Sequence, residues 1–171
     1  MTWWLAMGLI VLFLPYFPRS KHIHIFLAPL TLAFTNREAK GKLMEPTDSS
    51  SPGASSLDEL PWKQVFDSYA CIMCTRCHEV CPAHHSGTPL SPSALEINKR
   101  YFINQNAAGL ANGSTKLDLL QDAISEDAVW SCTTCMACVE VCPVGNEPMQ
   151  DILQIRRKLV FDAQMPDELA D

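Results

Sequence analysis

The sequence predicts an all-α fold, in which a C-terminal helical unit follows an apolar leader. Three observations indicate this class. No stretch shows the alternation of a strand over a useful length, several stretches have helical periodicity, and all eight cysteines fall into two short runs. A chain of 171 residues suits one modest domain with appendages.

Residues 1–44 are expected to form a membrane segment and an interfacial stretch. Thr2 to Pro18 carries no charged residue, and as a helix it would reach roughly 25 Å, slightly less than a hydrocarbon core of about 30 Å. Both of its ends are aromatic, as membrane helices prefer at their interfaces, through Trp3, Trp4, Tyr16 and Phe17. Ile23 to Phe34 is too short to span, so it is predicted to lie at the interface or on another membrane subunit.

The basic residues of the leader predict its orientation. They all follow the first apolar run: Arg19, Lys21, Arg37, Lys40 and Lys42. The positive-inside rule therefore places the N-terminus outside the cytoplasmic (inner) membrane and the rest of the chain on its cytoplasmic side. A cleaved signal peptide would need positive charge before the apolar run and a small-residue cleavage site after it, and neither is present.

His22 and His24 begin the second apolar stretch and allow two interpretations. They could hold a turn at the interface, or they could contact a haem or quinone of a neighbouring membrane subunit. We favour the turn, because spacing alone fixes no axial ligand.

Residues 45–61, EPTDSSSPGASSLDELP, predict a flexible linker, because Ser, Pro, Gly and acidic residues dominate and apolar residues almost vanish. Such a segment would typically reach some 20–25 Å. The helical unit is then expected over residues 62–171, where four helices are predicted: Trp62 to Ala70, Ser93 to Gln105, Leu117 to Ser125 and Met149 to Asp162.

Details of these helices can also be predicted. Ala107 to Ser114 is small, polar and contains glycine, which is typical of a loop, and Ser114 and Asp118 are candidate caps of the following helix. In the last helix one apolar face is expected to gather Ile152, Ile155, Leu159 and Val160. The basic residues 156–158 beside that face are expected to be solvated, with docking of a partner as the alternative.

The two cysteine runs repeat each other. Residues 71–83 read CIMCTRCHEVCPA and residues 132–144 read CTTCMACVEVCPV, so four Cys, a Glu-Val pair and a Pro coincide at an offset of 61. Disulfide frameworks spread their cysteines over small secreted chains, whereas these are crowded. C-x2-C-x2-C-x3-C-P is the bacterial-type iron–sulfur run. The sequence therefore predicts two [4Fe-4S] clusters on eight thiolates: Cys71, Cys74, Cys77, Cys81, Cys132, Cys135, Cys138 and Cys142.

Other metal chemistries fit these runs less well. Structural zinc sites usually pair two C-x2-C elements about 15–20 residues apart, with four ligands in all. Cys74 to His78 matches the C-x-x-C-H of c-type haem, but the second run has Val139 in place of the histidine. His78 is therefore expected to lie beside a cluster and to tune its potential through a hydrogen bond.

Charge divides the chain into two parts. Counted by residue, positions 1–47 carry a net charge of about +3 and positions 48–171 of about −9. A basic, apolar leader before an acidic unit favours attachment to a lipid membrane. The acidic unit carries no basic patch, which argues against nucleic acid as a partner.

The cysteine runs resemble those of the alpha-helical ferredoxin domain. VWSCTTCMACVEVCPVG, followed by IRRKLV, is similar to iron–sulfur subunits of the heterodisulfide reductase family, and PYFPRSKHIHIFLAPL resembles the end of a nitrate reductase gamma-like membrane domain. The resemblance implies that the fourth cysteine of each run serves the other cluster. One cluster would then take Cys71, Cys74, Cys77 and Cys142, and the other Cys132, Cys135, Cys138 and Cys81.

The same resemblance implies an electron-transfer subunit of an oxidoreductase, without a substrate site of its own. The sequence contains neither the CCG segments of many family members nor a Gly-rich flavin fingerprint. We expect single electrons to pass between a cytoplasmic partner, of the CCG type or a flavoprotein, and a membrane quinone or b-type cytochrome. The alternative is a structural or assembly subunit whose clusters stiffen a docking surface without redox cycling.

Overall fold

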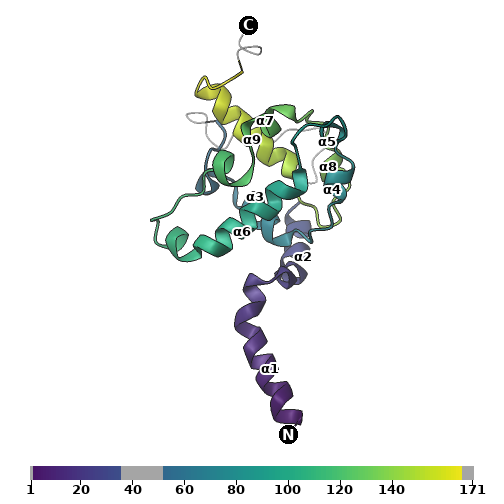
Figure 1. Ribbon diagram of the computed structural model, residues 1–171, viewed down its shortest axis with the longest axis vertical. Coiled ribbons are helices and arrows are strands. Elements are labelled where there is room, and N and C mark those ends of the chain that lie inside the picture. The colour runs from purple at the N-terminus through teal and green to yellow at the C-terminus, as the bar shows by residue number, and fades with distance from the viewer. Residues whose placement is uncertain (1, 36–51, 167–171) are drawn as a thin grey trace.

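The computed structural model describes residues 2–35 and 52–166 as a helical unit from which one helix projects (Figure 1). Nine α-helices fall in these ranges: α1 Thr2–Tyr16, α2 His24–Phe34, α3 Trp62–Ala70, α4 Arg76–Glu79, α5 Pro82–His85, α6 Pro92–Ala111, α7 Glu126–Ser131, α8 Ala137–Glu140 and α9 Pro148–Phe161. Single turns lie at η1 Phe17–Arg19, η2 Lys21–Ile23, η3 Leu57–Glu59 and η4 Leu119–Ala123. The same ranges contain no strand beyond an isolated bridge between Ser56 and Asp118. The all-α prediction is confirmed for them.

The leader forms α1 and α2, close to the ranges that the apolar runs predict. α1 projects from the helical unit in Figure 1, and none of its side chains is buried. Within residues 2–35 and 52–166, no helix combines the length and apolarity that crossing a membrane requires. Of the basic residues that predict the orientation, Arg37, Lys40 and Lys42 lie outside the described residues, as does the linker up to residue 51.

The two histidines of the leader lie at the turn η2, with His22 inside it and His24 directly after it. Nδ1 of His24 lies 2.5 Å from the carbonyl oxygen of Lys21, one helical turn earlier in the chain. The ring of His22 faces that of Phe13 at a centroid distance of 6.2 Å. Both contacts agree with the favoured interpretation, in which these residues hold a turn.

The second half of the predicted linker is packed against the helical unit. Ala54 is 1% exposed, and its amide donates to the carbonyl of Gln154 on α9 at 3.0 Å. The amide of Leu57 donates to the carbonyl of Leu117 at 3.2 Å, and Leu60 is buried. The prediction of a flexible linker is therefore wrong for residues 54–60, because backbone hydrogen bonds and small buried side chains fix a segment whose composition is polar.

Gly53 permits this packing, which gives a first testable expectation. Its φ is +98°, and a Cβ at this position would lie 2.3 Å from the carbonyl oxygen of Gln154 and 2.4 Å from the amide nitrogen of Lys158. Gly87 has a φ of +85° but open space around it. Both Gly→Ala variants bear the left-handed strain of about 1–2 kcal/mol, whereas only Gly53→Ala pushes the segment off α9.

Gly53→Ala should therefore lower the apparent Tm by at least about 2–4 °C more than Gly87→Ala, the shift expected of one further kcal/mol. Thermal unfolding followed by circular dichroism on the anaerobic protein measures both. Equal Tm values for the two variants would show that residues 53–54 do not pack on α9.

Between the cysteine runs, α6 is longer than predicted and the following helix is almost absent. α6 continues to Ala111 through a kink at Asn106, so the predicted loop is wrong for residues 107–111. Of Leu117 to Ser125, only the π-helical turn η4 forms. Asp118 does cap it, accepting from the amide of Leu120 at 3.0 Å, whereas the hydroxyl of Ser114 donates to the carbonyl of Gly109 instead.

The main apolar core is centred on α9. Ile152, Ile155 and Leu159 are at most 4% exposed and pack with Leu95 of α6 and Leu117. Val160 is 49% exposed, so its predicted place on this face is wrong, because one residue further along a helix turns the side chain by about 100°. The core thus joins both ends of the helical unit and includes Cys81, with Cys132 packed against it.

Candidate metal centres

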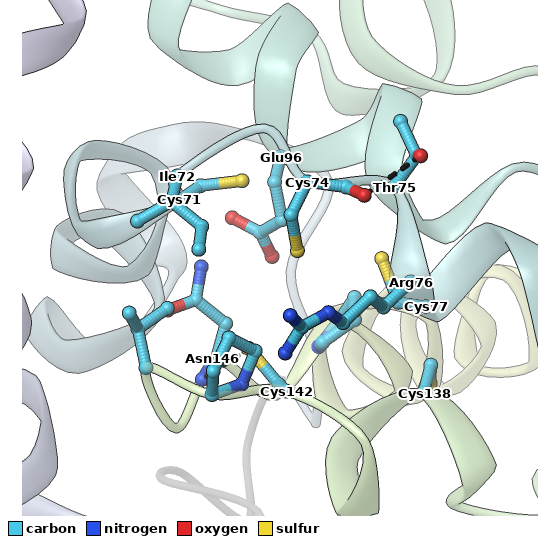
Figure 2. Close-up of a pocket in the computed structure, with 13 residues that line it drawn as sticks. Cys71, Ile72, Cys74, Thr75, Arg76, Cys77, Glu96, Cys138, Cys142 and Asn146 are labelled. Carbon is cyan, nitrogen blue, oxygen red and sulfur yellow. Dashed lines mark hydrogen bonds between the residues drawn. The ribbon is translucent and has the colours of Figure 1, made fainter.

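The eight cysteines border two separate cavities. The first is lined by Cys71, Cys74, Cys77 and Cys142, and also by Cys138. The second is lined by Cys81, Cys132, Cys135 and Cys138. Figure 2 shows the first cavity, with Cys71, Cys74 and Cys77 on one side and Cys142 on the other. In each cavity, three cysteines of one run therefore meet the fourth cysteine of the other, as the resemblance implies; the ligand sets themselves stay a prediction.

The two loops that carry these cysteines have left-handed residues at equivalent positions. Met73 and Thr75 have φ values of 57° and 60°, and the equivalent Thr134 and Met136 have values of 53° and 62°. A left-handed residue that is not glycine costs roughly 1–2 kcal/mol. The amides of Met73 and Thr134 each lie 3.4 Å from the sulfur two residues earlier, on Cys71 and Cys132. The repeated strain wraps each loop around its thiols and turns amide donors toward sulfur.

Burial disfavours thiolates in both cavities. It raises the pKa of Cys71 to about 11 and those of Cys77 and Cys138 to about 12. Cys135 differs, because the amide of Ala137 donates to its sulfur and lowers its pKa. Thiolates in such surroundings need a compensating positive charge, which bound iron supplies as the thiol protons leave. Eight free thiols distributed over two cavities therefore fit two [4Fe-4S] clusters.

The described residues contain no group of side chains that could hold a single metal ion. Over residues 2–35 and 52–166, no three His, Cys, Asp or Glu side chains converge closely enough to hold one metal ion. His78 is not among the residues that line either cavity. Its Nδ1 lies 2.9 Å from the hydroxyl of Ser91, and its ring contacts the tilted ring of His84 at a centroid distance of 3.6 Å.

A buried group of charges, here called the Lys99 network, lies behind the first cavity. It comprises Lys63, Asp67, Glu96, Lys99, Glu147 and Asp151. Nζ of Lys99 lies 3.1 Å from Oε2 of Glu96, pairs with Asp151 and donates to the carbonyl of Gln64 at 3.0 Å. Glu96 also borders the cavity, where its carboxylate stands among the thiols in Figure 2.

The network shifts the titration of its own members. Burial raises the pKa of Glu96 well above its usual range and raises the pKa of Asp151 as well. Burial also raises the pKa of Asp67 to about 6, although Lys63 at 3.0 Å opposes it. For Lys99, burial works against the charged form, but the two carboxylates outweigh it and raise its pKa. Sequence periodicity gave no signal of these buried charges, because it identifies apolar faces only.

Arg156 is a second residue whose role the sequence did not reveal. Its guanidinium donates to three carbonyls at the end of α7 and the start of the second loop, those of Val129, Trp130 and Cys132, at 2.9, 2.8 and 2.5 Å. The expectation of a solvated basic face is therefore wrong at this position. Arg156 satisfies carbonyls that a helix end leaves unpaired and fixes the entry to the second loop.

The family comparison agrees with this geometry. Residues 67–146 match the model of the 4Fe-4S dicluster domain. These residues are similar to that family and are here called the dicluster domain. The dicluster domain spans both cysteine runs and the helices between them, so the chain binds two [4Fe-4S] clusters, as the runs predict.

Three relatives place the domain among iron–sulfur proteins of oxidoreductases. The probable iron-sulfur-binding oxidoreductase FadF of Bacillus subtilis is 32% identical over 94% of this chain and 28% of its own length. EtfAB:quinone oxidoreductase of Syntrophomonas wolfei is 29% identical over 98% and 27%. One subunit of the ferredoxin:CoB-CoM heterodisulfide reductase of Methanosarcina mazei is 30% identical over 60% and 53%.

These matches confirm the resemblance to heterodisulfide reductase-type iron–sulfur subunits. The chain spans little more than a quarter of the length of the first two relatives. No solved structure matches the chain.

Proposed function

We propose that the chain is a membrane-attached subunit that relays single electrons between a cytoplasmic oxidoreductase and a membrane quinone or b-type cytochrome. The observation that carries the proposal is the position of Cys138, which borders both cavities. The two cluster sites are thus neighbours within one folded unit. Two neighbouring cluster sites favour passage of an electron from one to the other over two independent structural roles.

The proposed ligand sets follow the cavities. Cys71, Cys74, Cys77 and Cys142 would hold one cluster, and Cys132, Cys135, Cys138 and Cys81 the other; the lining of each cavity supports this division. When bound, each cluster supplies a centre that gains or loses one electron without making or breaking substrate bonds. The chain's own residues bind through thiolate sulfur, donate amide hydrogens to that sulfur and exclude water by burial.

Attachment to the membrane is proposed through the leader. α1 contains no charged residue and exposes an apolar surface along its whole length, which supports contact with lipid or with apolar helices of another subunit. The basic residues after it favour the cytoplasmic side for the dicluster domain. We retain residues 1–44 as the membrane part and 62–171 as the cluster part, and add residues 52–61 to the latter because they pack on it.

The partners are proposed by chemical class. Reduction of a quinone to a quinol takes two electrons and two protons, so one-electron centres must turn over twice for each quinol formed. The name of the Syntrophomonas relative includes a quinone, which supports a quinone as the membrane partner here. A flavoprotein or a CCG-type subunit would supply or receive electrons on the cytoplasmic side.

Redox-titrated EPR combined with liposome flotation tests the proposal. The anaerobically purified chain should give two interacting [4Fe-4S] signals and should float with liposomes. Replacing Leu9 and Val11 of α1 by arginine should abolish flotation, because each charge in the apolar region costs about 2.5–3.5 kcal/mol. Tyr101→Arg, at a site that is also exposed, is the matched control and should float normally. Zinc in place of iron, or a chain that stays with the soluble fraction, would contradict the proposal.

A further inference from the structure

The leader packs on the loops of the first cavity. Ala28 of α2 forms an apolar cluster with Ala70 and Val144, joined by Leu27, Ile72 and Cys142. Ala70 and Ile72 flank Cys71 in sequence, so α2 covers the ligand loops of the first cavity. Of the residues that line the second cavity, Cys81 belongs to the main core and Cys132 packs against it, and among the described residues that core includes none of α1 or α2.

The approach of α2 to these loops is close enough to require a glycine. Gly145, three residues after Cys142, has a φ of +71°. A Cβ there would lie 2.7 Å from Oγ1 of Thr35 and 3.1 Å from Cδ2 of Leu32. On its other side, the carbonyl of Gly145 accepts from Nζ of Lys63 at 3.2 Å. The loop after Cys142 is therefore fixed between the leader and the Lys99 network.

The junction between α1 and α2 is anchored to the same side of the unit. Arg100 of α6 is 1% exposed, donates to the carbonyl of Ser20 and lies over the ring of Tyr69 at 5.6 Å. The hydroxyl of Tyr69 donates to Asn104 at 3.0 Å. Tyr69 lies on α3, which leads directly into Cys71. Two helices beside the first cavity thus fix where the apolar leader leaves the unit.

Much of the surface of α2 outside its contact with the unit is exposed, although the ring of Phe26 contacts that of Phe17 and the ring of Phe34 contacts that of Trp62. Ile25, Phe26 and Phe34 are 56%, 63% and 55% exposed, while Ala28 and Thr31 face the unit and are buried. Phe17 contacts both Phe26 of α2 and Phe13 of α1. These contacts join the exposed surface of α2 to the uncharged surface of α1, which supports lipid as the neighbour of both. Only the thickness of one helix, about 10 Å, then separates the loops of the first cavity from that apolar surface.

We infer that the site bordered by Cys71, Cys74, Cys77 and Cys142 is the membrane-side site, that α2 is its cover, and that the site bordered by Cys81, Cys132, Cys135 and Cys138 faces the cytoplasmic partner. The inference rests on the proposed function and adds to it the order of the two cluster sites along the path of the electron. An electron exchanged with the membrane enters or leaves at the first site, and one exchanged with the oxidoreductase at the second. Each transfer oxidises one centre and reduces the next by one electron.

Distance from lipid gives the first test. The chain is placed in nanodiscs that contain a lipid with a chelated Dy³⁺ headgroup, and the spin relaxation of both cluster signals is measured by EPR. The signals are assigned with Cys74→Ser and Cys135→Ser, which stand at equivalent, exposed positions of the two loops. The signal that Cys74→Ser alters should relax several-fold faster with Dy³⁺, and the other signal should change little.

The outcomes separate this inference from the proposed function. A larger effect on the signal that Cys135→Ser alters, or equal effects on both, overturns the order of the sites while the proposed function stands. A chain that carries both clusters but does not enter nanodiscs overturns both.

Polarity at the cover gives a second test that needs no membrane. Ala28→Asn introduces an amide on the face of α2 that covers the first cavity, and Ile25→Asn introduces one on its exposed face. In detergent micelles, Ala28→Asn should shift the midpoint potential of the first signal alone, and Ile25→Asn should shift neither. A shift of the second signal by Ala28→Asn, or of the first equally by both variants, would show that α2 is not a cover of the first site.

Discussion

Replacing Cys71 and Cys142 together by alanine is expected to remove one [4Fe-4S] cluster and to leave about half of the iron per chain. The reason is the lining of the cavities, in which Cys142 stands with Cys71, Cys74 and Cys77 although 65 residues or more separate it from them. If both replaced thiols bind the same cluster, removal of the second thiol releases no iron beyond that released by removal of the first. Iron and sulfide per chain, measured after anaerobic purification, give the result directly.

The matched variant replaces Cys132 and Cys142, two cysteines of the same run. These two line different cavities, so this variant should lose nearly all of its iron. Both variants remove two thiols, and circular dichroism compares their folding. The reverse pattern, in which the Cys132/Cys142 variant keeps half of the iron and the Cys71/Cys142 variant keeps almost none, would establish that each run holds its own cluster.

The cysteine loops could be predicted from sequence because their chemistry is local. Three thiols spaced by two residues fit one turn of chain around a cluster, and the same spacing recurs in both runs. α3 and α9 were predictable for a similar reason, since α3 ends where a cysteine loop begins, and α9 starts at a proline and has helical periodicity. Pairing between the runs, in contrast, came from family resemblance and not from spacing.

Tertiary contacts account for the errors. Residues 54–60 have the composition of a linker, but Ala54 donates to α9 through its backbone, which composition does not record. Likewise, α6 buries Glu96, Lys99 and Arg100 between the apolar positions that periodicity identifies. A lysine that pairs with a carboxylate 52 residues away in sequence has the same local pattern as one in solvent.

Replacing Lys99 by methionine is expected to destabilise the protein by about 3–5 kcal/mol, the usual cost of breaking a buried ion pair by removing one partner. Lys99 is fully buried, and both Glu96 and Asp151 would lose their counter-ion with no access to water. For a chain of this length the loss corresponds to a decrease in Tm of about 6–20 °C, measured by thermal unfolding. Lys116→Met is the control, because Lys116 and its partner Asp58 are 74% and 58% exposed and such pairs contribute little.

The pH dependence of this loss identifies its cause. In the folded state the pKa values of Glu96 and Asp151 are raised, first by burial, and removal of Lys99 raises them further. Between the ordinary carboxyl range of the unfolded chain and these raised values, the folded state binds more protons, so its stability falls as pH rises. The difference in Tm between Lys99→Met and the native protein should therefore be smaller at pH 6 than at pH 8. A loss that reflected only poorer packing of the methionine would be the same at both.

Neutralising a carboxylate should then restore stability. Asp151→Asn in the Lys99→Met background removes one uncompensated charge while keeping the shape of the side chain, so Tm should recover by several degrees. Alone, Asp151→Asn should destabilise, because it deprives Lys99 of one of its two buried partners. The sign reversal between the two backgrounds is the signature of an interacting pair. Because Glu96 of the same network borders the first cavity, Lys99→Met should also shift the midpoint potential of the signal that Cys74→Ser alters more than that of the other.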